Sequence, residues 1–243
     1  MSSRPKVLAT ICARGGSLGV PGKNVRPLLG RSIIGYTIDC AKACDLIGEI
    51  VVSTDSDEIA AAAEAEDVPV PFRRPAEFAT AAAAKIHAIR HATEYVEVQK
   101  GFSPDIVVDL DIGVPMRVPA DIEGCVNVLT EDPDLDAAVT VYEAERSPYF
   151  NMVEYVDSNR VSLVKDAPAG IVRRQDAPPV YSITPAVFAF RRSRLDAVVH
   201  LFTGTWGAYV MPRERAVDID TDLDFDFVEF LMRRERGRGR AAL

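Results

Sequence analysis

The sequence has no long hydrophobic run. None of its apolar stretches approaches the roughly 20 residues that a membrane-spanning helix needs. The first of them, Val7–Cys12, is a short run of apolar and small residues, which is typical of a buried strand and not of a signal peptide. We therefore expect a protein with no membrane partner.

Cysteine and histidine are also scarce. The 243 residues include four cysteines and three histidines, too few for a disulfide scaffold. The cysteines lack the paired spacing of zinc ligands. Because nothing indicates secretion, we expect them to be reduced, small hydrophobic residues of a cytoplasmic protein. They are Cys12, Cys40, Cys44 and Cys125.

Acidic residues are missing from one part of the chain. The first 38 residues contain six basic residues and no Asp or Glu, whereas the remainder has 22 basic and 36 acidic residues. The net charge of −8 argues against a nucleic-acid partner. The local basic cluster favours a small polyanion, above all phosphates, with chance clustering as the alternative. The basic tail, residues 235–243, is predicted to be flexible and solvated.

Short apolar runs alternate with helix-like segments along most of the chain. This alternation predicts an α/β domain over residues 5–234, in which helices cover both faces of a mostly parallel sheet. Strands are expected at 6–12, 49–54, 68–72, 105–110, 136–142, 186–190 and 216–219. Helices are expected at 33–41, after Ser56, at 80–98, 120–130, 193–201 and 221–234. Because ligands bind outside the carboxyl ends of such strands, the loops after Cys12, Thr54 and Leu110 should line one cleft.

Residues 143–183 interrupt the alternation. They are rich in Pro, Tyr, Asn and Asp, with short strand-like pieces at 152–156, 161–164 and 171–173. This composition predicts an arm inserted in the sheet domain. Such an arm either makes a dimer contact or is a plain surface loop.

A glycine-rich turn follows the first strand. Ala13-Arg14-Gly15-Gly16-Ser17-Leu18-Gly19-Val20-Pro21-Gly22-Lys23-Asn24 has four glycines, which allow backbone N–H groups to turn toward an anion. Arg14 and Lys23 bracket the turn as two cations. The spacing fits neither a Walker A loop nor G-x-G-x-x-G. A phosphate-binding turn is favoured over a merely tight connection.

Two aspartates near the C-terminus form a candidate metal pair. Asp218 and Asp220 are two residues apart, so on an extended strand their side chains share one face. Mg²⁺ prefers one or two carboxylates together with phosphates and water. The segment 218–226 holds five aspartates, so an acidic, solvated helix start is the alternative.

The glycine-rich turn resembles the signature A-R-G-G-S-x-G-V-P-G-K-N of acylneuraminate cytidylyltransferases (CMP-sialic acid synthetases) and their CMP-nonulosonate relatives. Other pieces occur in family order, so that the resemblance covers about residues 6–231. They are Ser53-Thr54-Asp55-Ser56, Arg73-Arg74-Pro75-Ala76-Glu77, Arg173-Arg174-Gln175-Asp176 with Tyr181, and Asp218-Ile219-Asp220-Thr221. The resemblance implies a single three-layer, Rossmann-like nucleotidyltransferase domain whose inserted arm makes a homodimer.

The resemblance also implies a reaction and its residues. CTP and a sialic-acid-like nonulosonic acid would give a CMP-sugar and pyrophosphate, with Mg²⁺ held by Asp218 and Asp220, while Arg14 and Lys23 hold the triphosphate. The other implied nucleotide-binding residues are Ala13, Gly15, Gly16, Ser17, Asn24 and Arg74. The implied sugar-acid-binding residues are Asp111, Arg173, Gln175 and Tyr181.

Several positions depart from the family pattern. Leu18 stands where the family usually has Lys, and Asp111 where it usually has Gln. Gly113 and Val114 replace two hydroxyl residues. These changes keep three alternatives open: another sugar acid such as a Kdo-like one, another nucleotide such as GTP, or a non-catalytic relative that binds only nucleotide or a partner.

Overall fold

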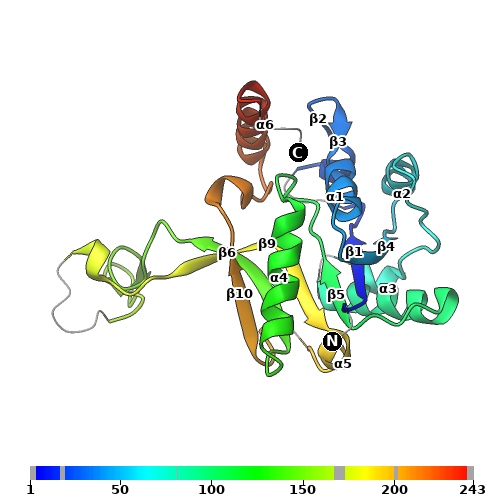
Figure 1. The fold of residues 1–243 in the computed structure, drawn as a ribbon. Helices are drawn as coiled ribbons and strands as arrows, with labels where there is room; N and C mark the ends of the chain where they lie inside the picture. Colours follow the sequence, from blue (N-terminus) through cyan, green and yellow to red (C-terminus); the bar gives the residue numbers. More distant parts are fainter. Residues whose placement is uncertain (1–3, 17–19, 81, 167–172, 200–201, 240–243) are drawn as a thin grey trace.

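The computed structural model describes residues 4–16, 20–80, 82–166, 173–199 and 202–239. Within these residues one central sheet has the strand order β10-β6-β9-β5-β1-β4 (Figure 1). Its strands are β1 (Val7–Cys12), β4 (Ile47–Ser53), β5 (Ile106–Asp109), β6 (Ala137–Glu143), β9 (Tyr181–Arg191) and β10 (Trp206–Val210). Only β9 runs antiparallel to its neighbours β5 and β6, so the sheet of the described chain is mostly parallel, as predicted.

Helices cover both faces of this sheet. One core lies beneath α1 (Ile33–Lys42), α2 (Asp57–Glu64), α4 (Pro119–Glu131) and α6 (Asp222–Gly237). The other lies beneath α3 (Lys85–Lys100) and α5 (Arg192–Leu195). The three-layer α/β architecture predicted from the sequence is therefore confirmed.

The local sequence explains the two cores. Strand β1 alternates its side chains between them, with Val7, Ala9 and Ile11 in one core and Leu8 in the other. This two-sided burial is what a central parallel strand requires. The next crossover helix, α2, begins where the Ser56 side chain accepts a hydrogen bond from the backbone N–H of Ile59, which satisfies one free donor of the first turn.

Three sequence predictions about elements were wrong. Residues 68–72 contain no strand, and the helix expected from residue 80 begins only at Lys85, because Ala84 has an extended backbone. The helix expected at 193–201 is the short α5, with residues 200–201 outside the described chain.

The strand expected at 216–219 was also wrong. The edge strand is instead β10, which includes Trp206 and pairs with β6. The backbone N–H of Ile219 bonds the carbonyl of Gly113 (2.9 Å), so this segment closes over a loop and does not join the sheet.

Between β6 and β9 the chain leaves the sheet. Its hairpin, β7 (Val153–Tyr155) and β8 (Val161–Leu163), projects from the body of the molecule (Figure 1). Both strands are solvent-exposed, Tyr155 most of all, with 78% of its surface accessible. Residues 171 and 172 of the third predicted strand piece lie outside the described residues. The chain described between these strands corresponds to the predicted arm.

Among the described helices, no segment has the length and apolar character needed to cross a membrane.

Candidate functional site

A cavity of about 440 Å³ lies at the carboxyl ends of β1 and β5. In a parallel sheet this edge is where ligands bind. The loop directly after Thr54, which was expected to line the cleft, contributes no lining residue. The lining residues come from the end of β1 and the glycine-rich turn, the segment between α2 and α3, the first residue of α3, the loop after β5 and the chain before α6. They are Cys12, Ala13, Arg14, Lys23, Asn24, Arg74, Phe78, Thr80, Ala83, Lys85, Asp111, Ile112 and Asp220.

The glycine-rich turn is held by hydrogen bonds at both ends. The N–H of Gly15 donates to Asp55 (2.9 Å), and the side-chain amide of Asn24 donates to the carbonyl of Arg14 (3.0 Å). Gly22 has a φ of +66°, a left-handed conformation that favours glycine. A Cβ on Gly16 would meet nothing within 4 Å. Ser17, predicted to bind nucleotide, lies outside the described residues.

Three of the predicted cations line the cavity, and each is anchored differently. Arg14 donates to the carbonyl of Thr80 (3.2 Å). Arg74 is buried and donates through Nε to the Ser53 hydroxyl (3.1 Å). Lys23 donates to the carbonyl of Ile219 (2.5 Å), and its Nζ lies 3.7 Å from Asp220 Oδ1. The glycine-rich turn and the segment before α6 thus meet at the cavity wall.

The aspartate pair has one buried and one exposed member. Asp218 Oδ1 is buried and has no hydrogen-bond partner among the described residues, whereas the Asp220 side chain is 76% exposed. Burial, with the charges of Asp111 and Asp220, raises the pKa of Asp218 to about 6. A carboxylate that is buried, unpartnered and disfavoured as an anion is stabilised by a nearby cation.

These residues fit Mg²⁺. The described residues contain no group of three or more His, Cys, Asp or Glu placed to hold a metal. One or two carboxylates are nonetheless the protein ligands that Mg²⁺ typically uses, with phosphates and water as the rest. The orphaned Oδ1 of Asp218 and the exposed carboxylate of Asp220 are the oxygen donors available for it.

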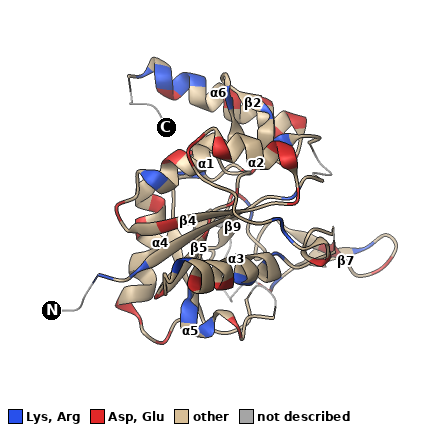
Figure 2. Ribbon diagram, turned by 90° about the vertical axis from the view of Figure 1, so that its right-hand side faces the viewer, with Lys and Arg blue, Asp and Glu red and all other residues tan. Residues whose placement is uncertain are grey.

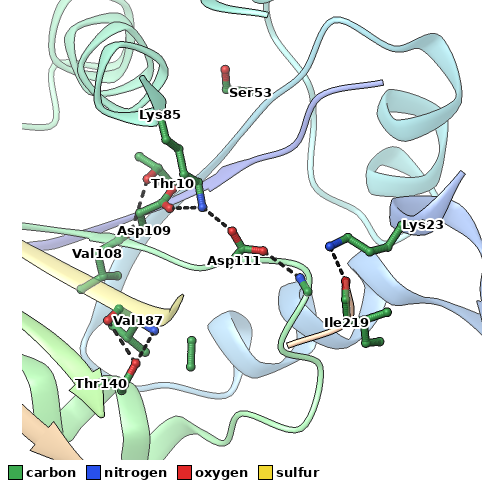
Figure 3. Close-up of polar contacts among 12 residues, drawn as sticks. Thr10, Lys23, Ser53, Lys85, Val108, Asp109, Asp111, Thr140, Val187 and Ile219 are labelled. Atoms are coloured by element: carbon green, nitrogen blue, oxygen red, sulfur yellow. Dashed lines mark hydrogen bonds and ion pairs between the residues drawn. The ribbon is translucent and has the colours of Figure 1, made fainter. Parts of the chain in front are cut away.

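Lys85 lies at the floor of the cavity, and the sequence analysis missed it. Its Nζ lies 2.6 Å from Asp109 Oδ2 and 2.7 Å from Asp111 Oδ2 (Figure 3). Burial would raise the pKa of Asp111, but the charge and hydrogen bond of Lys85, with the Gly113 N–H, lower it to about 2. Asp111, which stands where the family usually has Gln, is therefore already paired with a cation.

A second cavity of about 420 Å³ shares Asp220 with the first. Its wall includes Asp218, Tyr142 and Arg213. Tyr142 and Arg213 also border a third hollow, which contains Tyr181. The second cavity thus shares wall residues with both of the others, and Asp220 is the residue that it shares with the first.

Two of the predicted sugar-acid residues lie apart from these cavities. Arg173 and Gln175 are exposed residues of the arm segment and line none of the three. Arg173 donates to both oxygens of Asp176 (2.8 and 2.9 Å). This two-pronged contact is the geometry with which arginine binds a carboxylate. Their role at the site stays a prediction.

The basic end of α6 is remote from this site. The helix continues to Gly237, so the prediction of a flexible tail was wrong for residues 235–237. Arg234 and Arg236 lie in the last turn of α6, while Asp220 precedes its first turn. In Figure 2 the end of α6 nearer the C-terminus is blue, the colour of Lys and Arg. A helix of 16 residues is about 24 Å long. The distance separates these arginines from the cavity cations.

Comparison with known proteins identifies the family. A family model described as cytidylyltransferase matches residues 8–231. The chain belongs to the cytidylyltransferase family. It is 36% identical over 228 residues to post-translational flagellin modification protein B of Campylobacter coli, covering 94% of this chain and 95% of that protein. It is 37% identical over 227 residues to CMP-N,N'-diacetyllegionaminic acid synthase of Campylobacter jejuni, covering 93% and 95%.

A solved structure shares the fold of this cytidylyltransferase. The structure of CMP:2-keto-3-deoxy-manno-octonic acid synthetase complexed with CTP superposes with a TM-score of 0.67 at 20% identity, covering 95% of this chain and 99% of that one. The family and the nucleotidyltransferase class that the sequence resembles are thus confirmed, and the protein is an enzyme of that class.

Proposed function

We propose that this cytidylyltransferase joins CTP to a sialic-acid-like nonulosonic acid, giving a CMP-sugar and pyrophosphate in a Mg²⁺-dependent reaction. The observation that carries the proposal is the position of Asp220 on the wall between two cavities. Transfer of a nucleotidyl group needs a donor site and an acceptor site that meet at the α-phosphate. The aspartate pair stands at that meeting point.

The cations of the first cavity suit the triphosphate. Arg14 and Lys23 supply fixed positive charge next to backbone N–H groups of the glycine-rich turn, and this arrangement binds phosphate oxygens. The anomeric hydroxyl oxygen of the acceptor forms a bond to the α-phosphorus, and the bond to pyrophosphate breaks. Because charge builds on phosphate oxygens, positioning and cationic stabilisation supply most of the catalysis.

Asp218 and Asp220 would hold Mg²⁺ beside these oxygens. When bound, the metal neutralises part of the phosphate charge and helps to orient the reacting oxygens. The Asp218 carboxylate is placed for this role because nothing else among the described residues bonds its buried Oδ1. Lys23, in contact with both the Ile219 carbonyl and Asp220, fixes the spacing between the phosphate turn and the carboxylates.

The second cavity would hold the acceptor. Arg213 lines this cavity and forms an exposed ion pair with Glu145 (2.9 Å). A carboxylate of the acceptor would therefore compete with Glu145 for the Arg213 guanidinium group. The synthase of Campylobacter jejuni, whose name gives CMP-N,N'-diacetyllegionaminic acid as its product, supports a nonulosonic acid as the acceptor. We propose this class for the present enzyme.

The arm would complete the site from a second copy of the chain. Its exposed apolar residues on β7 and β8 offer a contact surface, and Arg173 and Gln175 lie on the same arm. In a homodimer the arm of one subunit would carry these polar residues toward the acceptor cavity of the other. Such an arrangement would give Arg173, Gln175 and Tyr181 their predicted sugar-acid role.

Product analysis tests the proposal. Purified protein with Mg²⁺ is incubated with CTP or GTP and one acceptor: N,N'-diacetyllegionaminic acid, N-acetylneuraminic acid or Kdo. Pyrophosphate release is measured and the nucleotide sugar is identified by mass. The proposal expects CTP with a nonulosonic acid to be the best pair. Turnover only with Kdo, only with GTP, or with no pair would overturn it.

A further inference from the structure

Lys85 occupies a position that packing alone does not require. It is the first residue of α3 and lines the first cavity, where its ammonium group lies between Asp109 and Asp111. Asp109 is fully buried and also accepts a hydrogen bond from the Thr10 hydroxyl (2.9 Å). A buried carboxylate needs a counterion, and Asp109 uses Lys85 for this purpose. The contact to Asp111 is additional.

That second contact begins a chain of bonds across the cavity wall. Asp111 Oδ1 accepts a hydrogen bond from the N–H of Gly113 (2.8 Å), and the Gly113 carbonyl accepts one from the N–H of Ile219 (2.9 Å). Ile219 is the residue between Asp218 and Asp220. In Figure 3 dashed lines join Lys85 to Asp111, and Ile219 to Lys23.

Gly113, which belongs to this chain of bonds, also lies close to the buried Asp218 carboxylate. A Cβ built on Gly113 would lie 2.1 Å from Asp218 Oδ1, so the backbone of Gly113 and this oxygen are in close contact. The bonds of Asp111 therefore fix both the main chain between the two aspartates and the room available to one of them.

We propose that Lys85 is a positioning residue that acts through Asp111 and Gly113 to hold Asp218 and Asp220 in the arrangement that binds the divalent cation. The inference rests on the proposed function, which assigns the metal to this pair. Lys85 itself touches neither aspartate in the contacts described. Its contacts reach the pair through the Asp111–Gly113–Ile219 bonds, and its charge also acts on Asp218 through space. Such outer partners of metal ligands typically contribute 10- to 100-fold in affinity or activity.

The variants are chosen so that the fold survives. Lys85→Met alone would leave Asp109 buried without a counterion, so it is combined with Asp109→Asn, which removes both charges. Lys85→Arg keeps the cation and serves as the conservative variant. Lys100→Met is the matched control, because Lys100 lies on the same helix, pairs with Glu49, and has the same 31% side-chain exposure as Lys85.

The experiment measures binding of Mn²⁺ as a spectroscopic substitute for Mg²⁺. Each protein is mixed with CTP, and free Mn²⁺ is followed by electron paramagnetic resonance. We expect the double variant to bind Mn²⁺ about 10-fold or more weakly. Lys85→Arg should recover most of this loss, and Lys100→Met should match the wild type. CTP affinity in EDTA should change by less than about twofold, because Arg14, Lys23 and Arg74 remain and the Lys85 ammonium is already paired with two carboxylates.

The possible outcomes distinguish a failure of the Lys85 proposal from a failure of the proposed metal site. Equal Mn²⁺ affinity in the wild type and the double variant would overturn the role of Lys85 and leave the metal site intact. Weakened CTP binding in EDTA to the same extent would show a general distortion of the cavity and would also overturn it. A wild type that binds CTP but no Mn²⁺ would overturn the proposed metal site, and this inference with it.

Discussion

The ammonium of Lys23 lies 3.7 Å from Oδ1 of Asp220, although nearly the whole chain separates the two residues in sequence. Lys23 ends the glycine-rich turn, and Asp220 precedes the last helix. Their contact joins a phosphate-binding turn to a candidate metal pair. A nucleotide with a bound cation needs both features on one side of the cavity, and the fold supplies them from its two ends.

Replacing Asp220 tests the metal pair. Asp220→Asn should lower Mg²⁺-dependent turnover at least about 100-fold, because even outer partners of metal ligands contribute up to that amount. The fold should be retained, since the side chain is 76% exposed. Steady-state kinetics over a range of Mg²⁺ concentrations measure the effect. Asp222→Asn is the control, because Asp222 is similarly exposed and pairs with Arg26. Wild-type turnover in Asp220→Asn would contradict the assignment.

Removing the Lys23 ammonium should discriminate between nucleotides. Lys23→Ala is expected to weaken CTP binding by about 10- to 100-fold, as a charge-assisted hydrogen bond contributes roughly 1.5–3 kcal/mol. CMP, which lacks the outer phosphates, should lose much less affinity. Calorimetric titration of both nucleotides gives the ratio, with Lys42→Ala as a surface control. Equal losses for CTP and CMP would show that Lys23 does not face the triphosphate.

The raised pKa of Asp218 predicts an unusual stability profile without metal. Between its ordinary value of 3.8 and about 6, the folded state binds the proton more tightly than the unfolded state. Stability is therefore lost as the pH rises through this range, and the ionised carboxylate costs at most about 3 kcal/mol above it.

Asp218→Asn should consequently be more stable than the wild type at pH 7.5 in EDTA, by about 1–2 kcal/mol after screening by solvent. Near pH 4 the two proteins should unfold alike. Thermal unfolding as a function of pH measures the difference. A variant that is less stable than the wild type at pH 7.5 would show that the ionised Asp218 carboxylate does not destabilise the metal-free fold.

The close contact at Gly113 gives a steric prediction. Gly113→Ala places a Cβ 2.1 Å from Asp218 Oδ1, so the carboxylate must move. Turnover should fall about 10-fold or more, in the range for a disturbed metal ligand. Gly237→Ala, with nothing within 4 Å of the new Cβ, is the control and should keep full activity. An unchanged kcat in Gly113→Ala would argue against a fixed position for Asp218.

The hairpin of the arm predicts an oligomeric interface. Tyr155 and Val161 are 78% and 52% exposed, so changing both to Ser should leave the folded subunit intact while removing apolar contact area. Sedimentation velocity should show a homodimer for the wild type and mostly monomer for the double variant. Val98→Ser, at a 75% exposed position on α3, is the control. A wild-type monomer, or a variant dimer of unchanged stability, would refute the interface.

Local patterns predicted the parallel strands and the first crossover helices. The run Val7–Cys12 is buried on both faces, and Ser56 has a side chain suited to capping. The same patterns failed at residues 216–219, whose apolar alternation resembles a strand. There the N–H of Ile219 bonds Gly113 in a distant loop, and no local pattern encodes that partner.

The cavity was predictable only in part for the same reason. Arg14, Lys23 and Asp220 could be proposed because each lies in a recognisable motif. Lys85 follows a run of alanines and carries no motif, so its ion pairs with Asp109 and Asp111 appear only once α3 and β5 are packed together. The one signal available was an unbalanced carboxylate at Asp111, which implied a cation nearby.

The most direct test of the account is CTP binding to the wild type and to Asp220→Asn, each with Mg²⁺ and with EDTA, in the absence of acceptor. UTP, ATP and GTP are compared under the same conditions. CTP should bind most tightly, and Mg²⁺ should strengthen its binding to the wild type. Asp220→Asn should lose this gain while still binding CTP in EDTA. Equal strengthening by Mg²⁺ in both proteins, or no preference for CTP, would contradict it.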